Sequence, residues 1–224
     1  MIAAPEPTTE TSSAPTITKI VVIDSQRSYV DALGLAFELT SDLRIVAQEP
    51  DIGQGVDTVR RLEPDLVITA SLPRSTFDEL SLVSELGDST QDPTPLVFLT
   101  AYPSPGLEVR AREYSHVSLL SKQVPVTDIV RNLRSIIAGS QVFVGVPRDP
   151  FRLSSAEFEV LEYLVSGQSA TQIAEDLHLS IHAIRARIRS LLAKTSSRSQ
   201  LEAVSKAISA GVVPPPPTRI VEDA

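Results

Sequence analysis

Residues 153–194 read LSSAEFEVLEYLVSGQSATQIAEDLHLSIHAIRARIRSLLAK, a pattern that predicts three short helices joined by tight turns. Two capping boxes stand just before apolar runs, where they favour the start of a helix: Ser154 with Glu157, and Ser169 with Gln172. Gly167 lies where the chain must turn between the first two helices, and Ser180 can cap the third. The segment therefore predicts a compact helical module.

The third of these helices carries charge of one sign, because five basic residues and no acidic residue occur between Ile181 and Arg198. At about 100° per residue, one side of this helix is apolar and is predicted to pack inward: Ile181, Ile184, Ile188, Leu191 and Leu192. The other side is a ridge of small residues with basic edges: Ala183, Ala186 and Ser190, with His182 nearby, flanked by Arg185, Arg187, Arg189 and Lys194. Such a ridge suits a helix in the major groove whose flanks reach phosphates.

The rest of the chain has the opposite charge. The protein has a net charge of −8, but residues 151–211 hold seven of its 20 Lys and Arg and six of its 28 Asp and Glu, which makes this segment +1. The remainder therefore carries −9 and would repel DNA. Contact with nucleic acid is expected from the helical module alone.

Composition excludes several classes of protein. With 224 residues, 42% of them hydrophobic and 21% charged, the chain is an ordinary globular protein of one or two domains. Absence of cysteine excludes disulfides and thiolate chemistry, and the three histidines lack metal-ligand spacing. Without a phosphate-binding glycine loop or a nucleophile motif, we predict no enzyme activity, no metal and no cofactor. No apolar run approaches membrane-spanning length and the N-terminus lacks a secretory signal, so we expect a cytoplasmic protein without membrane contact.

The first half of the chain alternates short β-branched runs with amphipathic segments of helical length. The runs are residues 19–23, 44–47, 65–69, 95–99 and 116–120. Apolar residues recur at helical spacing in the first and last amphipathic segments: Val30, Leu33, Leu35, Ala36 and Leu39, then Ile129, Val130, Leu133, Ile136 and Ile137. Five β and five α segments in alternation predict an α/β fold, a parallel sheet with helices on both faces.

These patterns divide the chain into five parts. We predict a disordered N-terminal tail over 1–17, an α/β domain over 18–139, a linker over 140–152, a four-helix domain over 153–212 and a Pro-rich tail over 213–224. The fourth helix of the all-α domain is expected from about Ser199 to Ala210.

The helical module resembles the LuxR/FixJ (NarL)-type helix-turn-helix. The similarity lies in L-S-x-x-E-x-E-V-L, G-x-S-x-x-x-I-A-x-x-L-x-L-S and I-R-x-x-I-x-x-L-x-x-K. The resemblance implies that Arg185 faces DNA, that Lys194 is the family's lysine near the end of the recognition helix, and that Glu159 is the buried glutamate of the first helix. Three positions depart from the family: Ala183 stands for the usual Thr, Arg187 for His and Thr195 for Leu. The missing Thr removes a phosphate hydrogen bond and Arg187 adds a charge, which puts the preferred DNA sequence in doubt.

The N-terminal pattern resembles a response-regulator receiver, which implies a flavodoxin-like five-stranded sheet of order 2-1-3-4-5. Receiver chemistry needs an acidic pair after the first strand and an aspartate after the third, to hold Mg²⁺ and accept phosphate. The matching positions here are Asp24 and Ser25 after the first strand, Thr69 and Ala70 at the end of the third, then Thr100 and Lys122. With no acceptor carboxylate, we predict a degenerate receiver that is not phosphorylated on aspartate. We expect Lys122 to pair with Asp24, and the domain to act as a dimerisation scaffold or to sense a small-molecule or protein ligand.

Together these features predict a sequence-specific transcriptional regulator that binds double-stranded DNA as a homodimer. In the family it resembles, the fourth helix commonly mediates dimerisation; Leu201, Val204 and Ile208 either do so here or cover the module's own core. The alternative is an adapter whose helix-turn-helix and degenerate receiver bind protein partners. Selection of genomic DNA separates the two, because only the regulator should enrich a motif with salt-dependent affinity.

Overall fold

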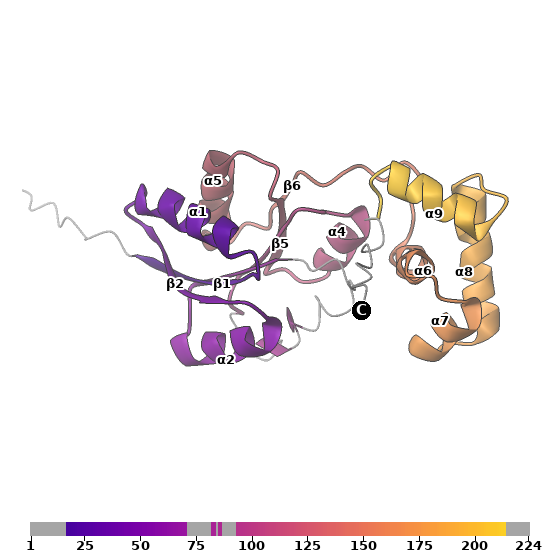
Figure 1. Ribbon diagram of the computed structural model, residues 1–224, viewed down its shortest axis with the longest axis horizontal. Coiled ribbons are helices and arrows are strands. Elements are labelled where there is room, and N and C mark those ends of the chain that lie inside the picture. The colour runs from indigo at the N-terminus through magenta and orange to yellow at the C-terminus, as the bar shows by residue number, and fades with distance from the viewer. Residues whose placement is uncertain (1–16, 71–81, 84, 87–92, 214–224) are drawn as a thin grey trace, which may run out of the picture.

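The computed structural model describes residues 17–70, 82–83, 85–86 and 93–213. They form an α/β part and an all-α part that lie side by side along the long axis of the molecule (Figure 1). Almost all of the predicted terminal tails falls outside the described residues. None of the helices in the described part is long and apolar enough to cross a membrane.

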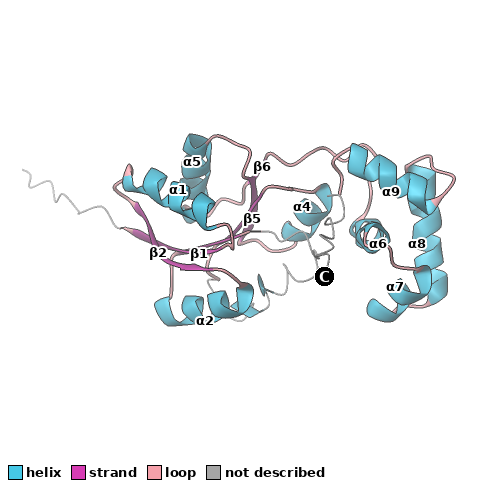
Figure 2. Cartoon of the chain, viewed as in Figure 1, coloured by secondary structure: helices cyan, strands magenta, loops and turns pink. Residues whose placement is uncertain are grey.

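The α/β part contains a parallel sheet ordered β2-β1-β3-β4-β5-β6. Figure 2 draws its strands in magenta. Its strands are β1 (Thr18–Ile23), β2 (Leu43–Glu49), β3 (Leu66–Thr69), β4 (Leu96–Thr100), β5 (Val117–Ser121) and β6 (Phe143–Val144). The five predicted strands are confirmed, and so is their order. The predicted number of strands was wrong, because β6 adds to the free edge of β5 within residues that were predicted to be a linker.

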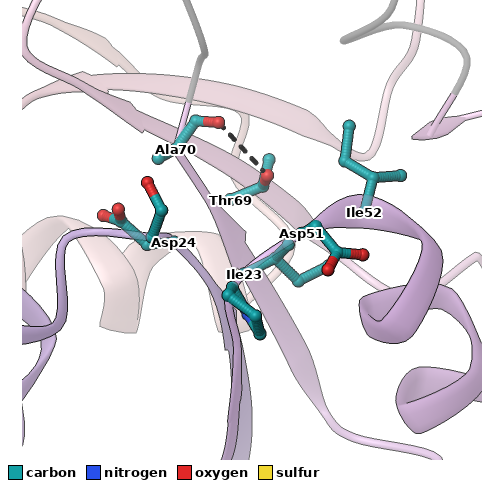
Figure 3. Close-up of a pocket in the computed structure, with 8 residues that line it drawn as sticks. Ile23, Asp24, Asp51, Ile52, Thr69 and Ala70 are labelled. Atoms are coloured by element: carbon teal, nitrogen blue, oxygen red, sulfur yellow. Dashed lines mark hydrogen bonds between the residues drawn. The ribbon is translucent and has the colours of Figure 1, made fainter.

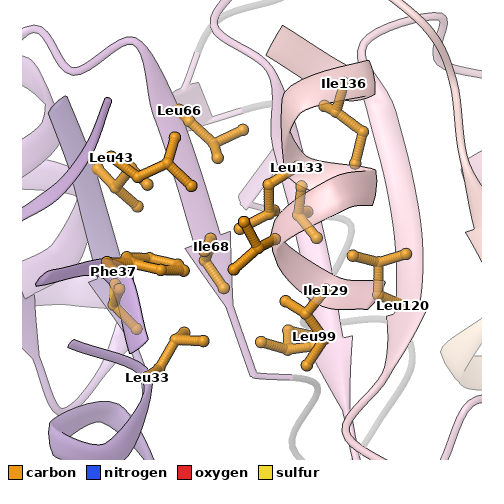
Figure 4. Close-up of a cluster of buried hydrophobic side chains, with 14 of the residues drawn as sticks. Leu33, Phe37, Leu43, Leu66, Ile68, Leu99, Leu120, Ile129, Leu133 and Ile136 are labelled. Carbon is orange, nitrogen blue, oxygen red and sulfur yellow. The ribbon is translucent and has the colours of Figure 1, made fainter. Parts of the chain in front are cut away.

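Helices cover both faces of the sheet, which explains the continuous apolar runs of its strands. Helices α1 (Arg27–Glu38) and α5 (Val126–Ile137) lie on one face, and α2 (Ile52–Leu62) and α4 (Pro105–Ala111) on the other. Figure 4 shows the first of the two cores, where Phe37 of α1 and Leu133 of α5 meet Ile68 of β3. One of the five predicted helices falls between β3 and β4, mostly outside the described residues.

The buried face of α1 differs from the one that the sequence predicted. Val30, Leu33 and Phe37 are buried, whereas Leu35 is 65% exposed and Leu39 is 91% exposed. The buried residues follow the i, i+3, i+7 spacing of a single helical stripe. Leu35 lies outside that stripe, and Leu39 caps the end of the helix, so neither reaches the sheet.

The edge strand β2 contains a bulge. Ile20 of β1 pairs with Ile45, but the next residue, Val21, pairs with Ala47, so Val46 is extra. The extra residue reverses the alternation of side chains, and Ile45 packs in the first core while Ala47 packs in the second. Val46 itself is 38% exposed.

The all-α part consists, in the described residues, of α6 (Ser155–Val165), α7 (Ala170–Asp176), α8 (Ile181–Lys194) and α9 (Gln200–Ser209). Both predicted capping boxes are present, and the Ser180 side chain accepts from the backbone N–H of Ala183. Gly167 turns the chain between α6 and α7 with φ of +84°. The four helices enclose a third core around Phe158, Ile173 and Ile184.

The segment between the two parts is bound to the sheet. Gln141 donates to the backbone oxygens of Tyr114 and Val117, at 2.8 and 2.9 Å. Gly145, with φ of +76°, lies so close to β5 that a Cβ there would be 2.5 Å from the Cβ of Ser121. Further on, Asp149 accepts from two backbone N–H groups in the turn into α6. Residues 140–152 therefore form an ordered connection.

Candidate nucleic-acid interface

Helices α7 and α8 form a helix-turn-helix in which α8 is fixed by its apolar side. Ile184, Ile188 and Leu191 are buried, and Ile181 and Leu192 are partly buried against the same core. The predicted packing face of this helix is confirmed. His178, with φ of +52°, lies in the turn that joins the two helices.

The opposite side of α8 is exposed to solvent. It presents a patch of residues that we call the α8 ridge: His182, Arg185, Ala186 and Arg189. Neither Arg185 nor Arg189 forms an ion pair with any residue in the described part of the chain, so both guanidinium groups are available to an anionic partner. Ala186, which lies between them, is also exposed and adds little bulk to this side of the helix.

Three other side chains predicted for this interface are held by acidic residues of α6. Arg187 donates to Glu159 at 3.1 Å, Ser190 donates to Glu157 at 2.6 Å, and Lys194 donates to Glu157 at 2.6 Å. Each contact ties α8 to α6. The structure thus gives these three side chains an internal bonding role, which the helical wheel alone did not predict.

Glu157 is the centre of this arrangement. It is 5% exposed and accepts from the backbone N–H and side chain of Ser154 as well as from Ser190 and Lys194. Burial by itself would raise the pKa of Glu157, but the hydrogen bonds from Lys194, Ser154 and Ser190 outweigh it and lower this pKa to about 2. The buried glutamate of the first helix is therefore Glu157. The prediction of Glu159 was wrong, because that side chain is partly exposed and pairs with Arg187.

A second candidate site lies at the carboxyl ends of β1 and β3. A small hollow, with a volume of about 10 Å³ and open to solvent, is lined by Ile23, Asp24, Ser25, Pro50, Asp51, Ile52, Thr69 and Ala70 (Figure 3). Four of the six residues predicted for the receiver pocket line it. Asp51, which caps α2, was not predicted, although an Asp just before a helix is a signal that could have identified it.

Lys122 lies beside this hollow and is fully engaged. Its ammonium donates to Asp24 at 2.6 Å and to Gln26 at 2.7 Å, and it lies 4.3 Å from the centre of the Tyr29 ring. The side chains of Lys122 and Asp24 are only 9% and 4% exposed, and the predicted pair is confirmed. Burial and the nearby charge of Asp24 raise the pKa of Tyr29 to about 12, so its hydroxyl stays protonated.

Both threonines predicted for this pocket are buried, whereas Ser25 is exposed. Thr69 is 2% exposed and its hydroxyl donates to the backbone oxygen of Ala70 at 3.5 Å. Thr100 is 1% exposed and accepts from the backbone N–H of Tyr102 at 3.0 Å. In the described residues, no three His, Asp or Glu side chains are grouped so that they could hold a metal ion.

Comparison with known proteins assigns the all-α part. Residues 152–207 match the family described as "Bacterial regulatory proteins, luxR family". Two relatives resemble most of the chain. The transcriptional regulatory protein DesR of Bacillus subtilis is 24% identical over 193 residues, covering 84% of this chain and 94% of DesR. The nitrate/nitrite response regulator protein NarP of Escherichia coli is 24% identical over 201 residues, covering 83% of this chain and 92% of NarP.

Solved structures share the fold. RcsB of Salmonella enterica serovar Typhimurium, bound to promoter rprA, matches with a TM-score of 0.63 at 19% identity, covering 86% of this chain and 99% of RcsB. An RcsB–DNA complex matches with a TM-score of 0.56 at 19% identity, covering 87% of this chain and 99% of that one. The chain therefore has response-regulator homologues and contains a LuxR-type helix-turn-helix domain.

Proposed function

We propose that this protein is a sequence-specific transcriptional regulator that inserts α8 into the major groove of double-stranded DNA. One observation carries the proposal: Arg185 and Arg189 are exposed and without a described ion pair on the outer side of the second helix of a helix-turn-helix. In an acidic chain, two such cations on a small-residue ridge are suited to phosphates or to guanine edges. The LuxR-family match and the regulator relatives support the same function.

The contacts of α8 divide its basic residues into two groups. Arg185 and Arg189, with His182 and Ala186, are the residues that we assign to DNA. Arg187, Ser190 and Lys194 orient the helix through Glu157 and Glu159, and their contact with DNA is secondary. Mutations in the first group should affect DNA affinity, whereas mutations in the second group should first affect the packing of α8 on α6.

DNA selection followed by affinity measurement tests this function. Arg185→Ala and Arg189→Ala should each weaken binding to the selected site by about 1–3 kcal/mol if the side chain reaches a base. Loss of a phosphate contact should instead reduce the slope of log affinity against log salt concentration by about one. Arg131→Ala is the matched control, because Arg131 is exposed on α5 of the other domain and should leave binding unchanged. Failure to enrich any motif at any salt concentration would favour the protein adapter.

We further propose that the N-terminal domain works without aspartyl phosphorylation. Ala70 follows β3 where a receiver carries its acceptor, Ser25 replaces one acid of the metal pair, and Lys122 is neutralised by Asp24. A dimerisation scaffold or a sensor of a small-molecule or protein ligand would need none of that chemistry. Incubation with a radiolabelled small phosphodonor should leave the protein unlabelled. Labelling that Asp24→Ala abolishes would contradict this.

A further inference from the structure

Helix α4 of the α/β part packs directly on α6 of the DNA-binding part. The contact is close because Gly106 has no side chain: a Cβ there would lie 2.8 Å from the ring of Phe158. Phe158 is 1% exposed and belongs to the core of the helical part. A helix of the N-terminal domain therefore closes part of the core of the C-terminal domain.

An ion pair crosses the same boundary. The Arg110 guanidinium on α4 donates to both carboxylate oxygens of Glu162 on α6, each at 3.2 Å. The two side chains are only 10% and 12% exposed. Removal of one of these side chains while the domains stay in contact is strongly unfavourable, because the other charge then stays buried without this partner.

The connection between the domains adds a second restraint. Strand β6 pairs with β5, Val146 packs in the second core of the sheet, and Pro147 lies beside Gly211 after α9. The chain that joins the domains is thus bound at both ends. It leaves little slack for the helical part to turn once α4 and α6 are in contact.

The α8 ridge faces away from this boundary. Helix α8 packs on α6, α7 and α9, and α6 lies between α4 and α8 (Figure 1). Contact between the domains consequently leaves Arg185 and Arg189 exposed.

We propose that Arg110 and Glu162, with the Gly106–Phe158 contact, form a latch that locks the two domains in one orientation with the α8 ridge open. The locked form is the form that is competent to bind DNA. The latch fixes the orientation of α8 in each protomer and does not cover the α8 ridge. The competence of the locked form rests on the proposed function, whereas the locking itself does not.

Spin labels can test the locking in the full chain, because the protein has no cysteine of its own. Nitroxides on Thr127→Cys of α5 and Ser205→Cys of α9, both exposed, report the distance between the domains. We expect one narrow distance distribution. Glu162→Ala should broaden it to several times its width, whereas Glu175→Ala, which removes an exposed acid of the same domain, should not. The proposal would be overturned by a broad distance distribution in the labelled protein with an intact Arg110–Glu162 pair, or by a narrow one in Glu162→Ala.

A charge-reversed pair keeps the test decisive if Glu162→Ala unfolds. Glu162→Arg faces Arg110 with a like charge and should broaden the distribution, and the added change Arg110→Glu should narrow it again. Circular dichroism confirms that each variant is folded. Failure of the second change to restore the narrow distribution in a folded protein would count against the pair.

DNA affinity then tests which form is competent. Opening the latch with Glu162→Ala should lower the affinity for a selected site, and an unchanged affinity would show that the open form is equally competent. A gain of about tenfold, equivalent to about 1.4 kcal/mol, would show that the locked form inhibits binding and would overturn this part of the proposal. Absence of DNA binding in every variant would contradict the proposed function and leave the spin-label result standing.

Discussion

At the scale of single residues, Glu157 shows how a charged side chain can organise a small core. It receives hydrogen bonds from α6 itself and from two residues of α8, so its position sets the position of the recognition helix. Lys194, which the resemblance placed near the end of the recognition helix, lies 36% exposed on this carboxylate. The geometry of the proposed DNA-facing side thus depends on a carboxylate that is itself buried.

Removal of the charge of Glu157 should destabilise the helical part. Glu157→Gln loses charge-assisted hydrogen bonds to Lys194 and Ser190, and we expect a loss of about 1–3 kcal/mol in the free energy of unfolding, measured in urea. Glu202→Gln is the control, because its pair with Lys206 on α9 is exposed to solvent and should contribute little to stability. Equal effects of the two substitutions would contradict the central role of Glu157.

The same carboxylate predicts a dependence of stability on pH. The pKa of Glu157 is lowered in the folded state from 4.5 to about 2, so the unfolded chain takes up a proton first as pH falls. The stabilisation is complete above about pH 4.5 and is lost as pH falls toward about 2. Unfolding measured across this range should show that the Glu157→Gln variant loses less stability than the native protein does. Parallel curves for the two proteins would refute the assignment.

The pair of Lys122 and Asp24 should be structural. Lys122→Met leaves a buried carboxylate without its cation, and we expect a loss of about 3–5 kcal/mol in unfolding free energy. Asp24→Leu together with Lys122→Met should lose less than Lys122→Met alone, since no charge is then left buried. Arg131→Met, which breaks the exposed pair with Asp128, should change stability by less than about 1 kcal/mol. A double variant that is less stable than the single one would argue against this explanation.

At the scale of elements, β6 shows that the segment between the domains is attached to the sheet and is not a free linker. The sequence shows prolines and no helical period there, which is typical of a linker. Two residues of strand are enough to attach it to β5, because Gly145 allows the chain to approach Ser121 closely. A strand of two residues is too short to produce a periodic signal, so only the structure could show it.

Two glycines with positive φ allow the cost of a steric clash to be distinguished from the cost of backbone strain. Gly145 and Gly139 have φ of +76° and +91°, but a Cβ at Gly139 would have open space around it. Gly139→Ala should therefore cost only the strain of positive φ, about 1–2 kcal/mol, whereas Gly145→Ala adds a clash with Ser121. Thermal unfolding should rank Gly145→Ala as clearly the less stable. The reverse order would mean that β6 is not tightly attached to β5.

The elements also show which parts of the molecule sequence reasoning can reach. The strands were predictable because burial on both faces produces unbroken apolar runs, such as the Leu-Val-Ile with which β3 begins. The inner face of α8 was predictable for a similar reason, because its apolar residues recur at helical spacing and so identify the side that packs on the core. The partners of Arg187 and Lys194 were not, because a helical wheel shows neighbours on one helix and nothing of the acids on another. The choice between Glu157 and Glu159 needed the position of α8 in space.

At the scale of the whole molecule, the outer surface of α9 is the candidate dimer contact. Leu201 is 79% exposed, whereas Val204 and Ile208 are partly buried in the core of their own domain. Of the three residues predicted for dimerisation, two therefore pack mainly within the protomer. Leu201 is the one that can contribute a large apolar surface to a second copy.

A charge at Leu201 should weaken dimerisation. Leu201→Glu places a carboxylate in the proposed contact and should shift the protein toward the monomer in sedimentation experiments. Leu39→Glu is the control, because Leu39 is 91% exposed on the other domain. If Leu39→Glu disrupts the dimer and Leu201→Glu does not, the contact lies on the N-terminal domain.

The bulge in β2 affects the tendency of the protein to aggregate at high concentration. An edge strand with a regular row of free N–H and C=O groups is a template for strands from other molecules, and β2 is the longer of the two edge strands. The extra residue at Val46 interrupts that row and bends the strand in its middle. A foreign strand could match only one half of the edge at a time. We therefore expect one inserted residue to make sheet-to-sheet aggregation through this edge less favourable.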